Sequence, residues 1–164
     1  MTPTKKTTTP RRKTPAVKLP PNPFVHEVLE LVDSQRSKAK KIEILREYAD
    51  DALKSILIWN FDPTAISVLP EGHVPYKENE VPVGTDHTSL RREWKNLYHF
   101  VKGGNDRLSA MRRETMFIQL LEGLHPEEAK IICLVKDKNL ESKYKITYDM
   151  VVQAYPDIQW GGRS

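Results

Sequence analysis

The sequence predicts an all-α protein, a compact bundle of six or seven short helices preceded by a disordered basic N-terminal arm. From Phe24 onward, apolar residues recur every three or four positions in short segments, which is the spacing of one helical face. Residues that favour helix starts and ends stand between these segments. The extended-looking runs VLP and VPV are too short and too proline-bound to form a sheet.

Three helices are expected between Phe24 and Phe61. Asp50 precedes the third, DALKSILIWNF, as its expected N-cap, and Pro63 closes it. The residues expected to face the core in these helices are, in order, Val25, Val28, Leu29, Val32; Ala39, Ile42, Leu45, Ala49; and Leu53, Ile56, Leu57, Phe61.

Residues 62–87 contain four prolines and two glycines, so they cannot be helical throughout. An irregular segment of this length is uncommon inside a compact domain and often has a function. The favoured interpretation is a packed surface loop whose Val, Leu and Tyr residues cover the core. The alternative is a set of apolar anchors for a protein partner, Val74, Tyr76 and Val81.

The second half predicts four more helices. The first opens at Thr88 and runs through SLRREWKNLYHFV; the glycines of KGGND then break the chain, and Asn105 is the expected cap of the next helix, which ends at Gly123. His125 and Pro126 start another helix, and Thr147 caps the last, which Pro156 stops. The expected organisation is an arm (1–23), a helical domain (24–158) and a loose tail (159–164).

Composition and charge place the chain among soluble intracellular proteins. Its 164 residues suit one domain, Cys133 is its single cysteine, and no apolar run approaches the roughly 18 residues of a membrane span. The first 23 residues carry six basic residues and no acid, whereas the rest has 20 basic and 22 acidic residues. The net charge of +4 therefore comes from the arm.

No motif for catalysis or cofactor binding is present. The sequence has neither a phosphate-binding Gly-Lys-Ser/Thr loop nor a Gly-x-Gly-x-x-Gly turn, and its five histidines lack metal-ligand spacing. Asp86, His87 and Ser89 are sequence neighbours at a helix start, where capping explains them better than a catalytic triad. We therefore expect no enzyme activity, no cofactor and no metal.

Basic residues beside expected helix starts are the candidate nucleic-acid contacts. Backbone N–H groups at a helix start favour a phosphate, and a nearby lysine adds a full charge. Each cluster alone is also typical of a solvated surface, but several clusters with a cationic arm favour DNA or RNA. The candidates are Lys5, Lys6, Arg11, Arg12 and Lys13 in the arm; Lys38, Lys40 and Lys41; Lys102, Gly103, Gly104 and Asn105; and Lys136, Lys138, Lys143, Lys145 and Thr147. Further basic edges lie at Arg36, at Arg91, Arg92 and Lys95, and at Arg112 and Arg113.

The order of elements resembles a known domain. EVLELVDSQRSKAKKIEILREYADDALKSILIWNF is followed by LYHFVKGGND, by MFIQLLEGLHPEEAKIICLVKD and by KYKITYDMVVQAYPDI. From Phe24 to Ile158 this resembles the N-terminal helical DNA-binding domain of phage-type ATP-dependent DNA ligases. Lys136–Asp137, Thr147 and Tyr155–Pro156 stand near that family's basic-aspartate pair, capping serine and aromatic-proline ending.

The resemblance implies a grip on the duplex backbone, largely across the minor groove, with phosphate contacts from the loop before the last helix. The chain departs from the family in that loop, which is longer and has Lys145 near the place of a glycine. The adenylation motif Lys-x-Asp-Gly is absent, so the chain cannot form an enzyme-adenylate. The chain also resembles uncharacterised small proteins of large tailed phages of marine bacteria.

Two functions follow as hypotheses. The first is a non-catalytic phage accessory protein that binds duplex or nicked DNA through its phosphates, without strong sequence preference, in the cytoplasm of the infected host. No expected helix shows the Arg/Asn/Gln-rich face of a major-groove reader. The alternative is a virion or host-interaction protein that docks on a phage or host protein through the basic arm and the 62–87 segment. Neither requires a membrane.

Overall fold

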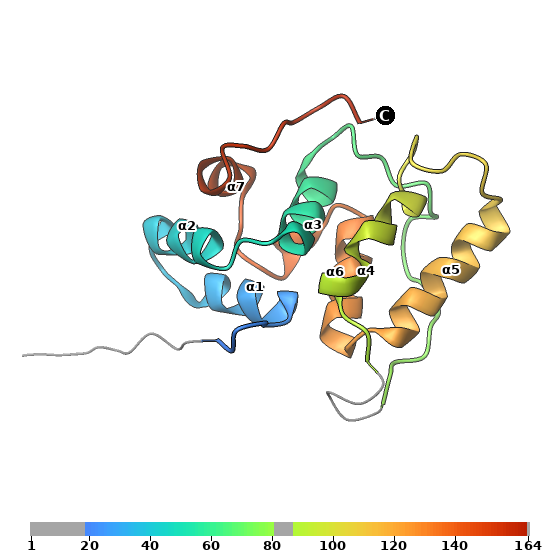
Figure 1. Cartoon of the computed structure of the whole chain (residues 1–164), viewed down its shortest axis with the longest axis horizontal. Helices are drawn as coiled ribbons and strands as arrows, with labels where there is room; N and C mark the ends of the chain where they lie inside the picture. Colours follow the sequence, from blue (N-terminus) through green and yellow to red (C-terminus); the bar gives the residue numbers. More distant parts are fainter. Residues whose placement is uncertain (1–18, 81–86, 164) are drawn as a thin grey trace, which may run out of the picture.

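The computed structural model describes residues 19–80 and 87–163. In these residues the chain is compact and helical, with two isolated β-bridges and no strand, which confirms the all-α prediction (Figure 1). Residues 1–18 of the predicted disordered arm lie outside the described part. No helix in the described ranges is both long enough and apolar enough to cross a bilayer.

Residues 19–80 and 87–163 contain seven α-helices and two 3₁₀ helices, most of which form three groups in space. Helices α3 and α6 occupy the middle; α1, α2 and α7 pack together on one side, and α4, η2 and α5 on the other (Figure 1). The elements are α1 (Val25–Ser34), α2 (Lys38–Glu47), α3 (Asp51–Phe61), α4 (Leu90–Glu93), η2 (Trp94–Phe100), α5 (Ala110–Gly123), α6 (Pro126–Lys136), η3 (Leu140–Ser142) and α7 (Tyr148–Ala154).

The predicted core faces of α1 and α3 are confirmed, and that of α2 is corrected. The four predicted residues of α1 are buried, as are the first three of α3, while Phe61 is half-buried. In α2, Ala39 and Ala49 are exposed, and Lys41 is buried beside Ile42 and Leu45. The Lys41 ammonium donates to the carbonyl oxygen of Lys145 at 2.8 Å, so its aliphatic stem can cover the core.

Helix starts set by adjacent residues match the prediction. Asp50 accepts a hydrogen bond from Leu53 N at 2.9 Å, and Thr147 accepts one from Met150 N at 3.3 Å. His125 Nδ1 accepts from Glu127 N at 3.0 Å, with Pro126 as the first helical residue. These caps satisfy backbone donors that have no partner inside the helix.

The start of α5 differs from the prediction, because a distant side chain holds the preceding loop. Ser109, not Asn105, is the N-cap, and it accepts from Arg112 N at 3.1 Å. The buried guanidinium of Arg113 donates to the carbonyl oxygens of His99 (2.9 Å), Asn105 (3.1 Å) and Leu108 (3.0 Å). These bonds hold the loop that precedes α5 against the helix, and its residues lie in turns up to the N-cap.

The fourth predicted helix is one α-helical turn, α4, followed by the tighter helix η2. Three residues per turn place Leu97 and Phe100 on one buried face. Beyond η2, the chain pairs with the 62–80 segment: Val68 N donates to Phe100 O at 3.0 Å and Lys102 N to Ile66 O at 2.7 Å. This pairing ends the helix and fixes the position of the following glycine turn.

The described part of the long irregular segment, residues 62–80, is a packed loop. Leu69, Val74 and Tyr76 are partly buried against the core. Val74 and Tyr76 thus contact the core and keep part of their surface exposed, Val81 lies outside the described residues, and docking of a partner on this segment stays a prediction. The packing of these side chains agrees with the favoured interpretation of the segment.

Glu128 joins three helices near the centre of the fold. Its carboxylate is fully buried at the start of α6 and accepts from Val25 N (2.8 Å) and Leu90 N (3.0 Å), the first residues of α1 and α4. Burial raises the pKa of Glu128, although both hydrogen bonds favour the charged form. One side chain thus caps two other helices and sets where they begin.

Candidate nucleic-acid interface

The arm residues predicted to contact nucleic acid lie outside the described residues. They are Lys5, Lys6, Arg11, Arg12 and Lys13. Their role stays a prediction.

The lysines at the start of α2 have local partners. Lys38 forms an ion pair with Asp149 on α7, and Lys40 Nζ lies 3.7 Å from Glu43 Oε1. Lys41 is buried and bonded to a carbonyl oxygen. The structure therefore does not present this cluster as a set of unpaired charges.

The lysine-rich stretch after α6 is mostly committed to holding the fold. Lys136 is buried, and its ammonium donates to Pro70 O (2.8 Å), Gly72 O (3.1 Å) and Asp137 Oδ1 (2.6 Å). Lys138 Nζ donates to the carbonyl oxygens of Trp59 (2.5 Å) and Asp62 (2.8 Å), and burial lowers the pKa of Lys138.

Lys143 and Lys145 complete that stretch, and they differ. Lys143 Nζ lies 3.0 Å from Glu127 Oε1, and its hydrogen bond, with that of Lys130, lowers the pKa of Glu127 to about 2. Lys145 is exposed, and within the described ranges its ammonium has no ion-pair partner. Three of the four lysines of this stretch thus have partners within the protein, and their contact with phosphate stays a prediction.

The glycine turn at 102–105 is also not the helix start that was predicted. Gly103 N, which could have met a phosphate, donates to Asp106 Oδ1 at 3.0 Å. The side-chain amide of Asn105 contacts His99 Nδ1 at 3.0 Å. Thr147, the remaining candidate, is occupied as the cap of α7. Lys102, the one cation of this group, is exposed and forms no ion pair with any described residue.

Unpaired positive charge is concentrated instead in residues 88–113, from α4 to the first turn of α5. This segment holds seven basic and two acidic residues, net +5, whereas the rest of residues 24–164 sums to −7. Arg91 pairs with Asp50 at 2.9 Å and Arg113 is buried. The other five are exposed and make no ion pair with any described residue: Arg92, Lys95, Lys102, Arg107 and Arg112.

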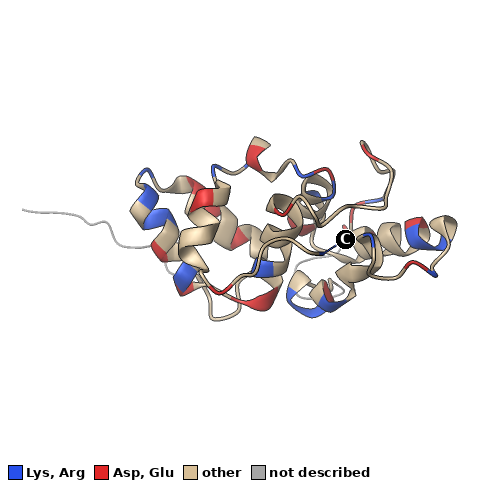
Figure 2. Ribbon diagram, turned by 90° about the horizontal axis from the view of Figure 1, so that it is seen from above, with Lys and Arg blue, Asp and Glu red and all other residues tan. Residues whose placement is uncertain are grey.

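Basic residues elsewhere alternate with acidic ones. Figure 2 shows Lys and Arg on many elements, with Asp and Glu interspersed among them. The segment 88–113, with the unpaired cations named above, will be called the basic segment. Its density of unpaired cations distinguishes it from the lysine clusters at α2 and after α6.

A pocket of about 370 Å³ adjoins the basic segment. It lies between α3, η2, the glycine turn and the C-terminal tail. Three aromatic side chains (Trp59, Trp94 and Tyr98) and three cations (Lys95, Lys102 and Arg163) contribute to its lining, which includes no acidic residue among those described. We refer to it as the aromatic pocket.

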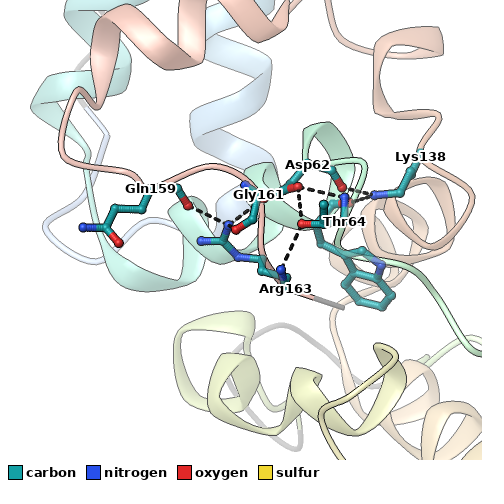
Figure 3. Close-up of polar contacts among 7 residues, drawn as sticks. Asp62, Thr64, Lys138, Gln159, Gly161 and Arg163 are labelled. Carbon is teal, nitrogen blue, oxygen red and sulfur yellow. Dashed lines mark hydrogen bonds and ion pairs between the residues drawn. The ribbon is translucent and has the colours of Figure 1, made fainter.

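The tail wall of this pocket is fixed by a buried carboxylate. Asp62 Oδ2 accepts from Gly161 N (2.8 Å) and Arg163 Nη1 (2.5 Å), and Asp62 Oδ1 accepts from Thr64 N and Oγ1 (Figure 3). Burial alone would raise the pKa of Asp62, but these hydrogen bonds lower it to about 2. The tail, expected to be loose, is therefore bound to the domain through residue 163.

The comparison with protein families then places the chain. Residues 28–142 match a family whose description reads Family of unknown function (DUF6433). The chain belongs to the DUF6433 family. No curated protein matches it, and no solved structure matches it. The resemblance to the ligase domain consequently stays a prediction.

The DUF6433 match begins at Val28 within α1, ends at Ser142 with η3 and includes the whole basic segment. It leaves out the arm, α7 and the tail, and hence the Arg163 side of the aromatic pocket. Of the candidate interface, the family match therefore includes the basic segment, with its unpaired cations.

Two features of the described residues bear on whether the chain can hold a metal ion or present a reactive thiol. No group of three or more His, Cys, Asp or Glu residues in the described ranges is arranged to hold a metal ion. Burial raises the pKa of the Cys133 thiol to about 11, which keeps it in the protonated, weakly nucleophilic form at neutral pH.

Sequence reasoning noted most of the basic segment but ranked the lysine stretches above it. Arg107 and Arg163 were missed. A local charge count would have found the segment, since its net charge of +5 is visible in the sequence. The contribution of Arg163 depends on the tail folding back, for which the sequence has no local signal.

Proposed function

We propose that the protein is a non-catalytic nucleic-acid-binding protein that holds the phosphate backbone of duplex DNA without strong sequence preference. The arm and the basic segment supply the contacts. The supporting observation is that five exposed cations of the basic segment have no ion-pair partner among the described residues, whereas Lys38, Lys40, Lys136 and Lys143 each have one. By its resemblance to phage proteins, it would act in the cytoplasm of an infected bacterium.

An unpaired cation should bind a phosphate at a lower cost in free energy than a cation that must first leave a carboxylate. A cation that contacts a phosphate releases a counterion from DNA, and this release drives salt-dependent binding. Lys38 or Lys143 would have to leave its carboxylate first. Lys102 and Arg112 have no such partner in the described part of the chain, so they can approach a phosphate without that cost.

Two double variants test whether the phosphate contacts lie on the basic segment. Lys102→Gln with Arg112→Gln should weaken binding to a blunt duplex by about tenfold and reduce the slope of log affinity against log salt by roughly 2. The matched control, Arg36→Gln with Lys40→Gln, removes the same charge from the α1–α2 side and should change the affinity by less than about twofold. Fluorescence anisotropy at two salt concentrations measures both.

The outcomes separate three cases. Equal losses in both double variants would mean that total charge, not the basic segment, governs binding. Binding that does not respond to salt would overturn a phosphate grip altogether. Absence of binding to duplex DNA, single-stranded DNA and RNA would favour docking on a protein partner through the arm.

A further inference from the structure

We propose that the aromatic pocket receives the base of one unpaired nucleotide, with its phosphate held by Lys95 and Lys102. The inference rests on the proposed nucleic-acid binding and deepens it, because it specifies a DNA that carries an unpaired base beside a duplex. Neither the backbone grip nor the family description assigns a ligand to this pocket.

The pocket offers partly exposed aromatic surface from Tyr98 and Trp94, while Trp59 is a buried part of its lining. Tyr98 is 50% exposed, and its hydroxyl makes no hydrogen bond with any described residue. Trp94 is half-buried beside it, and Trp59 is buried and held by a hydrogen bond from its indole N–H to Ser67 Oγ at 2.8 Å. Nucleobases stack on such side chains whatever their identity, which fits binding without sequence preference.

Cations lie at the same rim. Lys95 Nζ is 5.8 Å from the centroid of the Trp94 ring, so an ammonium and an aromatic face are presented together. Lys102 comes from the glycine turn, and Arg163 from the tail. A ligand that is aromatic at one end and anionic at the other matches this lining, whereas a simple anion would leave the aromatic surface unused.

The pocket is built before any ligand arrives. A Cβ at Gly104 would overlap the carbonyl group of Tyr98, so glycine permits the turn to fold directly against η2. On the opposite wall, the bonds of Asp62 to Gly161 and Arg163 hold the tail in place (Figure 3). Its volume of about 370 Å³ is within the range of small-ligand sites.

The base must be unpaired for a geometric reason. In an intact duplex both faces of each internal base are covered by its neighbours, so stacking in a protein pocket requires the base to leave the stack. A nick, an overhang or a flap supplies such a base at low cost. The backbone of the adjoining duplex would then lie along the basic segment.

A fluorescent base reports on the pocket directly. We would compare a blunt duplex with the same duplex carrying one overhanging 2-aminopurine, whose fluorescence falls when it stacks on an aromatic ring. The full-length protein should quench the overhanging base and bind the overhang duplex about tenfold more tightly than the blunt one, as expected for one stacked base.

Variants of two similarly exposed tyrosines supply the control. Tyr98→Ala should abolish the quenching and the tenfold preference, and Tyr98→Phe should restore both, since it returns the ring. Tyr148→Ala, on α7 and 47% exposed in the native protein, should retain both. Equal binding of the two duplexes, or quenching that survives in Tyr98→Ala, overturns the pocket. Loss of salt-dependent binding to the blunt duplex overturns the proposed function instead.

Discussion

Gly104 shows how one residue can fix a turn without needing a left-handed backbone. Its neighbour Gly103 has a φ of 86°, but Gly104 is required because a side chain there would meet the Tyr98 carbonyl. Gly104→Ala should destabilise the protein by about 2 kcal/mol or more, as overpacking does. Urea unfolding measures this; Gly123→Ala, whose Cβ would lie 3.5 Å from Thr88 Cγ2, should leave stability unchanged or slightly higher.

His125 makes stability depend on pH near neutrality. Its ring lies 4.7 Å from that of His26 and 5.5 Å from that of His87. Burial, with the charges of these two histidines, lowers the pKa of His125, while Glu127 and Glu27 oppose the shift. A lowered pKa means that the folded state prefers the neutral ring, so stability is full above 6.5 and falls as the pH drops below it.

The measurement is the free energy of unfolding by urea titration at several pH values from about 7.5 down to about 5, which span the ordinary histidine pKa. His125→Asn retains an N-cap oxygen but does not titrate, so its stability should change less across this range. An unchanged pH profile in the variant would contradict the assignment.

At the scale of elements, the first residue of a helix was predictable where a neighbour in sequence caps it. It was not predictable where side chains further along the chain decide it. The caps at Asp50, His125 and Thr147 follow from residues within three positions. The delayed start of α5 depends on Arg113, which binds carbonyl groups up to 14 residues away. The site shows the same limit: the sequence reveals that Lys136 is charged, but its partners Pro70 and Gly72 are more than 60 residues away.

The C-terminal tail is an element that one carboxylate holds. Asp62→Asn should weaken its bonds to Gly161 and Arg163, because hydrogen bonds to a charged group contribute about 1.5–3 kcal/mol. Amide hydrogen exchange at Gly161 and Arg163 should then accelerate about tenfold or more. Asp149→Asn, which removes the exposed partner of Lys38, should leave both amides unchanged. Equal protection in Asp62→Asn would show that the tail is held by other contacts.

For the whole molecule, charge is divided between two positive regions and an otherwise acidic body. Residues 1–18 hold six basic residues and the basic segment is +5, while the remaining residues of 24–164 sum to −7. If the protein binds DNA as proposed, this distribution of charge should favour contact of the phosphates with the basic segment over contact with the rest of the body. The arm can extend the contact along the backbone wherever the body docks.

This division predicts how binding depends on salt. If the arm and the basic segment together neutralise about six phosphates, the slope of log affinity against log salt should be roughly −5 for the full chain. Removing residues 1–18 takes away six cations and leaves the five unpaired ones of the basic segment, so the slope should fall to about half while binding persists. Leu19 and Pro23, which contact Tyr48 and Arg91, remain in that variant, so its melting temperature should match that of the full chain. A slope near zero after truncation would assign all phosphate contacts to the arm, and an unchanged slope would assign them all to the body.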